Sequence, residues 1–258
     1  TESSEIEPLN DFHARLATPE GQKRAKRLEV DQDFLKDMKA VKDKVYSYSG
    51  EKNRISTAPE SLAPNSTLRH EIEHGVQESV KSTHNKKLPF NLKTASTEDI
   101  LDFSKTSRIA ASGRTEVDDL LGHLDLKKSS ELKSLPTGSQ KRVNPEKSYL
   151  EAEYYYLKDE KAAADYFSTG SDGREKAPFL GEVQQYMMDN QLLPKRKYTK
   201  VTPQLVEKAY KSAGKNLRLF NIMEPSSKNF KLISAVLNKM LTPAAAVGAS
   251  LLYSKDKD

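Results

Sequence analysis

Two histidines and a glutamate are the residues of this sequence whose types and spacing are best suited to chemistry. His70 and His74 stand four residues apart in the stretch "LRHEIEHGVQ", and Glu71 directly follows the first histidine. Residues four apart lie on one face of a helix, so both imidazoles can direct a ring nitrogen at one ion about 2.0 Å away. Glu71 lies one residue round the helix, where its carboxylate can accept a proton from water and return it to a leaving amine. The H-E-x-x-H spacing therefore predicts a zinc site that hydrolyses a bond.

The other interpretation of these residues is a charged surface helix that matches a short pattern by chance. The surrounding sequence favours the metal site. Asn65 or Ser66 can cap a helix that we expect to reach about Lys81. Ile72 and Val76 would give that helix a buried face.

Two neighbours of this stretch bear on how a substrate would reach the metal. A β-hairpin is predicted over residues 45–57, on either side of the polar turn "SGEKN". The edge strand of such a hairpin could pair with an extended peptide beside the helix. Gly75 follows the second histidine, and we expect its missing side chain to let another segment approach the metal closely.

A catalytic zinc site needs a third protein ligand and one open position. The chain has no cysteine, so the third ligand must be a histidine or a carboxylate. A longer pattern with a third histidine six residues after His74 fails, because that position is Val80. The other histidines, His13, His84 and His123, are expected to be surface or loop residues.

A carboxylate on a later helix is the remaining solution. In "YLKDEKAAADYF", Glu160 is followed three residues later by Ala163, whose small side chain would let this helix pack closely against the histidine helix. The aromatic residues around it indicate a buried helix. Glu160 is the favoured third ligand, and Asp159, Glu153 and Glu151 are the alternatives.

The elements that must position these residues are mostly helical. We expect an extended segment over residues 1–20 and one or two short amphipathic helices over residues 19–42. The hairpin and the histidine helix follow, and a later helix over residues 144–170 is expected to break near Lys158. Three more helices are predicted in "APFLGEVQQYMMDNQLL", "TPQLVEKAYKSAG" and "NFKLISAVLNKML".

Composition narrows the classes of function. The absence of cysteine excludes disulfides, a thiolate nucleophile and a cysteine-ligated zinc ribbon. The net charge of +5 arises from 42 basic and 37 acidic residues that are mixed along the chain, so nucleic acid is a weak candidate partner. The sequence has no apolar run of about 18 residues, so we expect no membrane span. Because the chain begins at Thr1 without a methionine, we expect a processed fragment or a trimmed chain.

The residues quoted above resemble a known family. "TLRHEIEHGVQ", followed by an E-x-x-A helix, is similar to the small gluzincin-like metallopeptidase domains in the very large inner-virion proteins of tailed bacteriophages of the crAss-like type. The resemblance covers about residues 45–252, with specific matches at residues 67–77 and 157–163 and none over 85–145. One departure is that the later helix of related domains often runs E-x-E-A-R, whereas Lys161 and three alanines follow Glu160 here.

The resemblance implies a site and a setting. It makes His70 and His74 ligands of one zinc ion, Glu160 the third ligand and Glu71 the general base and acid. The chain would be a cleaved segment of a virion polyprotein, located inside the capsid or tail, with a polypeptide substrate or other virion proteins as partners. Without the resemblance, the expected location is the cytoplasm. The alternative function is a non-catalytic structural or cargo virion protein whose metal site is structural or a relic.

These expectations together give an α+β, mainly helical fold. Its centre would be a small zincin-like core with a short β-hairpin or sheet, the H-E-x-x-H helix and a glutamate-bearing helix. The expected organisation has three parts. They are an N-terminal helical and extended segment (1–43), a metal-binding core with a polar insertion at about 85–145 (44–170), and a C-terminal helical region with a tail (171–258).

Overall fold

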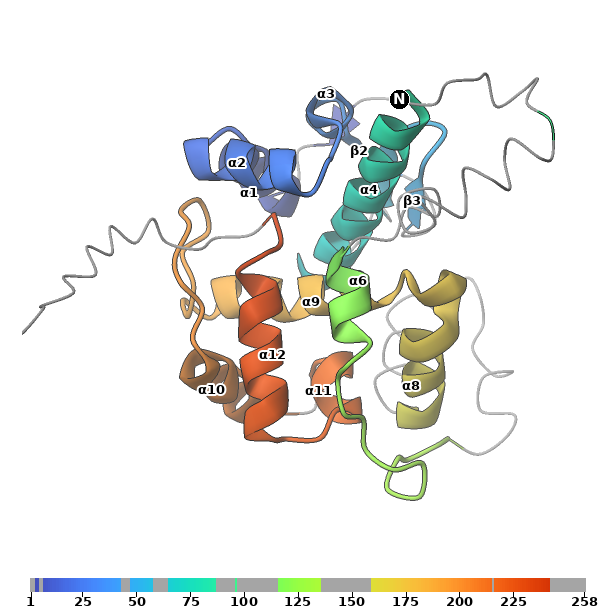
Figure 1. Ribbon diagram of the computed structural model, residues 1–258, viewed down its shortest axis with the longest axis vertical. Coiled ribbons are helices and arrows are strands. Elements are labelled where there is room, and N and C mark those ends of the chain that lie inside the picture. The colour runs from blue at the N-terminus through green and yellow to red at the C-terminus, as the bar shows by residue number, and fades with distance from the viewer. Residues whose placement is uncertain are drawn as a thin grey trace, which may run out of the picture.

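The computed structural model of the chain is an α+β structure in which helices predominate, as the sequence predicts. The described residues are 3–4, 7–42, 47–57, 65–86, 96, 116–135, 159–214 and 216–241. Its elements, labelled as in Figure 1, are β1 (Ser3–Ser4), α1 (Glu7–Leu16), α2 (Pro19–Arg27), α3 (Gln32–Lys36), β2 (Lys39–Lys42), β3 (Ser47–Ser49), β4 (Arg54–Thr57), α4 (Asn65–Lys86), α6 (Glu116–Leu121), α8 (Glu160–Thr169), the 3-10 turn η2 (Gly170–Gly173), α9 (Lys176–Asp189), α10 (Pro203–Ala213), α11 (Arg218–Ile222) and α12 (Ser227–Leu237).

The N-terminal segment differs from its expected extended form. Residues 7–16 form α1, which buries Leu9, Phe12 and Leu16. These residues are three and four apart, so they share one face of the helix. This spacing indicates a helix, although the segment as a whole is polar. Burying each such side chain contributes about 1.5–3 kcal/mol, which favours the helix over an exposed extended chain.

The predicted hairpin is confirmed and belongs to a larger sheet. Strand β3 pairs with β4 in antiparallel register, with Tyr48 opposite Ile55. Strand β4 also pairs in parallel with β2, which was not predicted, and β1 completes the order β1-β2-β4-β3. The part of the hairpin prediction that falls on Val45 and Tyr46 lies outside the described residues. Strand β3 is thus one edge of the sheet, and it packs beside α4.

Helix α4, which carries the two histidines, is longer than predicted and separates two hydrophobic cores. Leu68, Ile72, Val76 and Val80 recur every four residues and are buried in the core formed with α1–α3 and the sheet. In Figure 1, α1, α2 and α3 lie on one flank of α4 and β3 lies on another. The C-terminal end of α4 extends to Lys86, so His84 is within the helix rather than in a loop.

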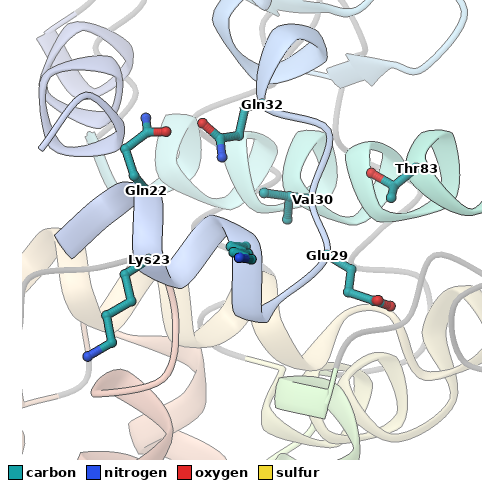
Figure 2. A pocket seen from close by; sticks show the side chains of 7 residues that line it. Gln22, Lys23, Glu29, Val30, Gln32 and Thr83 are labelled. Atoms are coloured by element: carbon teal, nitrogen blue, oxygen red, sulfur yellow. The ribbon is translucent and has the colours of Figure 1, made fainter. Parts of the chain in front are cut away.

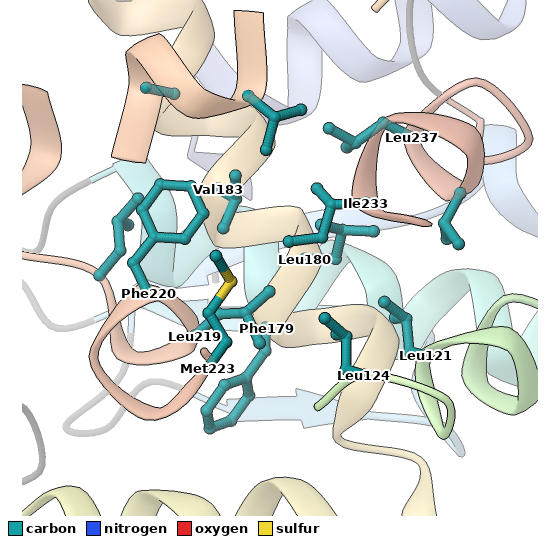
Figure 3. Packing of buried hydrophobic residues seen from close by; sticks show 14 of the residues in the cluster. Leu121, Leu124, Phe179, Leu180, Val183, Leu219, Phe220, Met223, Ile233 and Leu237 are labelled. Carbon is teal, nitrogen blue, oxygen red and sulfur yellow. The ribbon is translucent and has the colours of Figure 1, made fainter. Parts of the chain in front are cut away.

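Helix α9 is the centre of the second core. Its apolar residues pack with α6, α8, α10, α11 and α12, and Phe179, Leu180 and Val183 are completely buried. Figure 3 shows these three side chains surrounded by residues of α11, α12 and the segment after α6. Helix α9 is buried on nearly all sides, which explains why it could be predicted as a helix but not oriented from its periodicity.

The packing of α4 against α9 joins the two cores. A side chain at Gly181 would bring its Cβ to 2.9 Å from Glu73 Cγ and 3.3 Å from the Arg69 carbonyl oxygen. The absence of that side chain lets the two helices approach closely at this point. Gly75, by contrast, faces the sheet side, where a Cβ would lie 2.4 Å from Met38 Sδ and 3.3 Å from Tyr48 Cε2. Met38 and β3, rather than a segment that reaches the metal, occupy the space that Gly75 leaves.

Part of the region expected to be a polar insertion belongs to the second core. Val117, Leu121, Leu124 and Leu132 are buried there, and residues 126 and 223 form an isolated β-bridge. The short helix α11 was not predicted, whereas α9, α10 and α12 correspond to the three predicted C-terminal helices. Within the described ranges, no helix is both long enough and apolar enough to cross a bilayer.

Candidate metal centre

His70 and His74 point their Nε2 atoms at the same carboxylate. Glu175 Oε2 lies 3.2 Å from Nε2 of His70 and 3.5 Å from Nε2 of His74. One potential ligand atom from each of the three residues lies within 4.8 Å of the others. Neither approach is a well-aligned hydrogen bond, so this buried oxygen has no directed donor among the described residues. Three ligand atoms that converge in this way could hold one metal ion.

Glu175 reaches the histidines from the start of α9. It immediately precedes the helix, after the 3-10 turn η2, and its side chain makes no capping hydrogen bond. The carboxylate is therefore free to turn toward α4. Its position at a helix N-terminus favours the ionised form by about 0.3–1 kcal/mol. Burial alone would raise the pKa of Glu175, but the adjacent imidazoles of His70 and His74 outweigh it and hold this pKa well below its usual value.

Both imidazoles are restrained through their other nitrogen. His70 Nδ1 lies 2.8 Å from Glu182 Oε1, and His74 Nδ1 lies 3.0 Å from Gln77 Oε1. Since these oxygens accept hydrogen bonds, each Nδ1 carries a proton and each Nε2 can offer its lone pair to a metal. Partners of this kind fix the tautomer and the ring orientation of metal-binding histidines. The three residues could therefore hold a metal ion, with Glu182 and Gln77 as the supporting residues of the two histidines.

The two supporting residues are themselves held. Glu182 is ion-paired with Arg218 of α11, whose guanidinium also lies 4.4 Å from the centre of the Phe179 ring. Gln77 donates from Nε2 to the Arg174 carbonyl oxygen at 2.6 Å and to the Asp118 carboxylate at 3.2 and 3.3 Å. The site thus draws on α4, α6, α9 and α11.

The two carboxylates beside His70 favour its protonated form. Burial by itself lowers the pKa of His70, but its close contacts with the Glu175 and Glu182 carboxylates outweigh burial and raise this pKa to about 9. Burial likewise opposes ionisation of Glu182, and the charge of Arg218, followed by the contacts with His70, nevertheless lowers the pKa of Glu182. At neutral pH His70 is therefore an imidazolium between two carboxylates.

Glu71 and Tyr166 lie at the accessible side of the centre. Glu71 is half-buried, and Tyr166 of α8 is exposed. Burial, then the charge of Glu175 and a hydrogen bond to it, and more weakly the charge of Glu71, raise the pKa of the Tyr166 phenol. The charge of Glu71 therefore acts on the Tyr166 phenol, which is hydrogen-bonded to Glu175, one of the three converging residues.

The structure does not bring Glu160 to the histidines. Glu160 Oε2 instead accepts a hydrogen bond from the Lys133 backbone N–H at 3.1 Å. Asp159 caps α8, because its Oδ1 accepts from the Ala162 N–H at 3.0 Å. Glu151 and Glu153 lie outside the described residues. Glu175 replaces Glu160 as the carboxylate beside His70 and His74. The boundary expected at residue 170, between the metal-binding core and the C-terminal region, therefore separates Glu175 from the two histidines.

The sequence contained a signal for the missed residues. Glu175 and Glu182 stand seven residues apart, which is about two helical turns, so they lie on the same face at the start of α9. Two acids on one face of a helix rich in apolar residues are a signal of a possible role. Arg218 and Asp118 had no such signal, because each comes from a short helix distant in sequence.

The other histidines do not join the centre. His13 is half-buried, and its Nε2 lies 2.9 Å from the Leu35 carbonyl oxygen, while His123 is exposed. The side chain of His84 lies outside the described ones. A separate surface pocket of about 740 Å³ lies between α2 and the C-terminal end of α4 (Figure 2), and no residue of the centre lines it.

No protein-family profile, curated protein or solved structure matches this chain.

The third ligand can be tested with a matched pair of variants. Glu175→Gln removes the charge beside His70 and His74, and we expect zinc affinity to fall by at least about a hundredfold, the upper end of the loss seen when a supporting residue is removed. Glu160→Gln changes another buried glutamate, and the new amide oxygen can still accept from the Lys133 N–H, so zinc affinity is expected to remain unchanged. Competition titration with a chromogenic chelator measures both. Weaker zinc binding in Glu160→Gln alone would contradict the assignment.

Metal binding is expected to release the proton of His70. Because the pKa of His70 is raised from 6.5 to about 9, the metal-free residue is charged at neutral pH and loses its proton as the pH rises through about 9. Zinc affinity should therefore rise by about tenfold per pH unit up to that value for this one proton. Calorimetry in buffers of different ionisation enthalpy measures the release. An observed heat that is independent of the buffer at pH 7.5 would show that His70 is not the group displaced.

Proposed function

We propose that the chain is a zinc-dependent hydrolase of peptide bonds whose metal is held by His70, His74 and Glu175. The observation that carries the proposal is the convergence of two Nε2 atoms on Glu175 Oε2, while both Nδ1 atoms are held by outer acceptors. A chance H-E-x-x-H match on a surface helix does not predict a carboxylate that converges on both histidines, nor a hydrogen-bond acceptor for each Nδ1 atom.

The donor atoms favour zinc over other common metals. Two imidazoles and one carboxylate suit zinc, whereas calcium and magnesium prefer sites made of oxygen atoms. Three protein ligands leave a fourth position open, which distinguishes catalytic from closed structural zinc sites. The chain supplies a buried, polarised pocket for the ion, since His70 and Glu175 are both buried.

Glu71 is the residue proposed to move the proton. Zinc held by these ligands would supply Lewis acidity, which lowers the pKa of water to about 7 and polarises the scissile carbonyl. Glu71 directly follows a ligand and is only half-buried, so its carboxylate can accept the proton of the attacking water. The same carboxyl group then gives that proton to the amine that leaves.

Tyr166 is proposed to stabilise the negative charge that develops on the carbonyl oxygen. Its raised pKa keeps the phenol protonated at neutral pH, so the O–H can donate a hydrogen bond. The ring is anchored next to Phe179, with the two ring centres 6.1 Å apart, and the side chain is still exposed enough to meet a substrate. Loss of one such donor typically costs about a hundredfold or more in rate.

The sheet edge offers a way to hold an extended peptide. Strand β3 is an edge strand beside α4, and Tyr48 lies against Gly75, the residue after His74. A peptide that paired with β3 would run alongside the part of α4 that bears the ligands. This arrangement supports a polypeptide substrate rather than a small molecule.

The proposed setting is the interior of a bacteriophage virion. It is supported by the resemblance of residues 67–77 to the H-E-I-x-H-x-I-Q stretch of gluzincin-like domains in inner-virion proteins. Gln77, the last residue of that stretch, is the hydrogen-bond acceptor that holds His74. The substrates would then be polypeptides encountered in or delivered by the particle.

A structural metal site is the second candidate function. Its support is the burial of the centre, because His70 is 5% exposed and Glu175 1% exposed, so substrate access depends on the side of His74, Glu71 and Tyr166. In this case the ion would fix α4 against α9 and no peptide would be hydrolysed. The two candidates share the ligands and differ in the role of Glu71.

The variant Glu71→Gln separates the two candidates. We expect it to bind zinc with wild-type stoichiometry and to lose hydrolysis of an unstructured protein by about a hundredfold or more, because the amide cannot accept a proton. Glu78→Gln, two turns along α4, is the matched control and is expected to retain activity. Equal hydrolysis by wild type and Glu71→Gln would contradict the proposed mechanism. Zinc binding with no hydrolysis by either protein would favour the structural site.

A further inference from the structure

A second group of buried charges lies beside the contact between α4 and α9. We call it the buried polar layer, and it consists of Arg15 of α1, Arg69 and Glu73 of α4, and Gln184 of α9. Arg15, Arg69 and Gln184 are fully buried, and Glu73 is nearly so. None of these side chains takes part in the proposed metal centre.

The positive charges of the buried polar layer outnumber its negative charges. Arg69 is ion-paired with Glu73 and donates from Nε to Gln184 Oε1 at 3.0 Å. Arg15 has only neutral partners, the Lys195 carbonyl oxygen at 2.6 Å and Met188 Sδ at 3.5 Å. The nearby Asp11 is paired at 2.7 Å with Arg196. Among the described residues, no carboxylate is ion-paired with Arg15, so this buried guanidinium relies on the more distant charges of Asp11 and Glu73, which is costly in a protein interior.

The two arginines also repel each other. Burial, together with the charge of Arg69, holds the pKa of the Arg15 guanidinium well below its ordinary value. The charged form of Arg15 is therefore destabilised by its surroundings. An additional negative charge between the two guanidinium groups would relieve both the desolvation and the repulsion.

Several donors of the layer have no acceptor. Nε and Nη2 of Arg15, Nη1 of Arg69 and Nε2 of Gln184 are buried, and none has a hydrogen-bond partner within the described part of the chain. Buried N–H groups are almost always paired in folded proteins, so a group of unpaired donors from three helices indicates an unaccounted acceptor. All four atoms are donors, and the unpaired acceptor of the layer, Glu73 Oε1, already faces Arg69 Nη2 in their ion pair, which points to a missing anion rather than a cation.

We propose that the buried polar layer binds one small monovalent anion, of the size and charge of chloride, between Arg15, Arg69 and Gln184. A single negative charge would balance the excess guanidinium. The donor atoms are almost completely shielded from solvent, which favours a compact spherical anion over phosphate or sulfate. Such an ion would connect α1, α4 and α9, and it would not depend on a metal at the proposed zinc centre.

Halide dependence of stability provides the first test. We compare the Tm of the protein in sodium chloride and in sodium gluconate at equal ionic strength, with EDTA present so that chloride cannot act through a metal. Saturating chloride is expected to raise the Tm by about 3 to 6 °C, because an ion that binds only the folded state stabilises it. Equal Tm values in the two salts would overturn the proposal.

Two variants determine whether the effect belongs to this layer. Arg15→Met keeps an apolar side chain of similar length and removes the unbalanced charge, so we expect it to fold and to lose the chloride shift. Arg24→Met is the matched control, because Arg24 is also buried but is ion-paired with Glu20 at 2.9 Å. The control is expected to retain the shift. A chloride shift that persists in Arg15→Met would place the ion elsewhere and contradict the proposal.

Anomalous diffraction from crystals of the wild-type protein grown in sodium bromide gives a test that needs no variant. The expected result is one bromide peak within hydrogen-bond distance of the Arg15 and Arg69 guanidinium groups. A map with no peak between them would overturn the proposal even if Arg15→Met does not fold.

Discussion

The close packing of α4 against α9 is the contact on which the rest of the structure depends. Helix α4 contributes the two histidines, and α9 begins at the carboxylate that faces them and contributes Glu182 about two turns further on. The contact is close because Gly181 leaves room for Glu73 and the Arg69 backbone. Each helix also carries its own hydrophobic core on its other side, so the centre lies where two independently packed halves meet.

That location has an energetic consequence. The helix contact buries ionisable groups, and a buried charge is costly unless a charged or polar partner within the contact compensates it. At the metal centre the compensation comes from alternating charges, in which Arg218, Glu182, His70 and Glu175 follow one another. A proton on His70 supplies the positive charge between Glu182 and Glu175 in this series. The buried carboxylates are therefore balanced by the protein's own residues. The buried polar layer lacks the corresponding balance, because Arg15 has no carboxylate partner.

The sequence predicted the parts of the structure that depend on local periodicity. The four-residue spacing of His70 and His74, the polar turn inside the hairpin and the apolar stripes of α9, α10 and α12 are all local patterns, and the structure has the corresponding elements. The third carboxylate was wrongly placed, because the choice between Glu160 and Glu175 depends on which later helix packs against α4. That choice is made by Gly181 and the buried residues of α9, and an E-x-x-A spacing on α8 holds no information about it. The helix α1 was missed for a different reason, since three large apolar residues in ten are too few to stand out in a polar segment.

The central claim is that His70, His74 and Glu175 together hold one zinc ion. Anomalous diffraction at the zinc absorption edge, from crystals of the zinc-loaded protein, tests it most directly. We predict one peak about 2.0 to 2.2 Å from Nε2 of both histidines and from a carboxylate oxygen of Glu175. A peak that is bound by the histidines but lies near another carboxylate, or the absence of zinc from this position, would contradict the account.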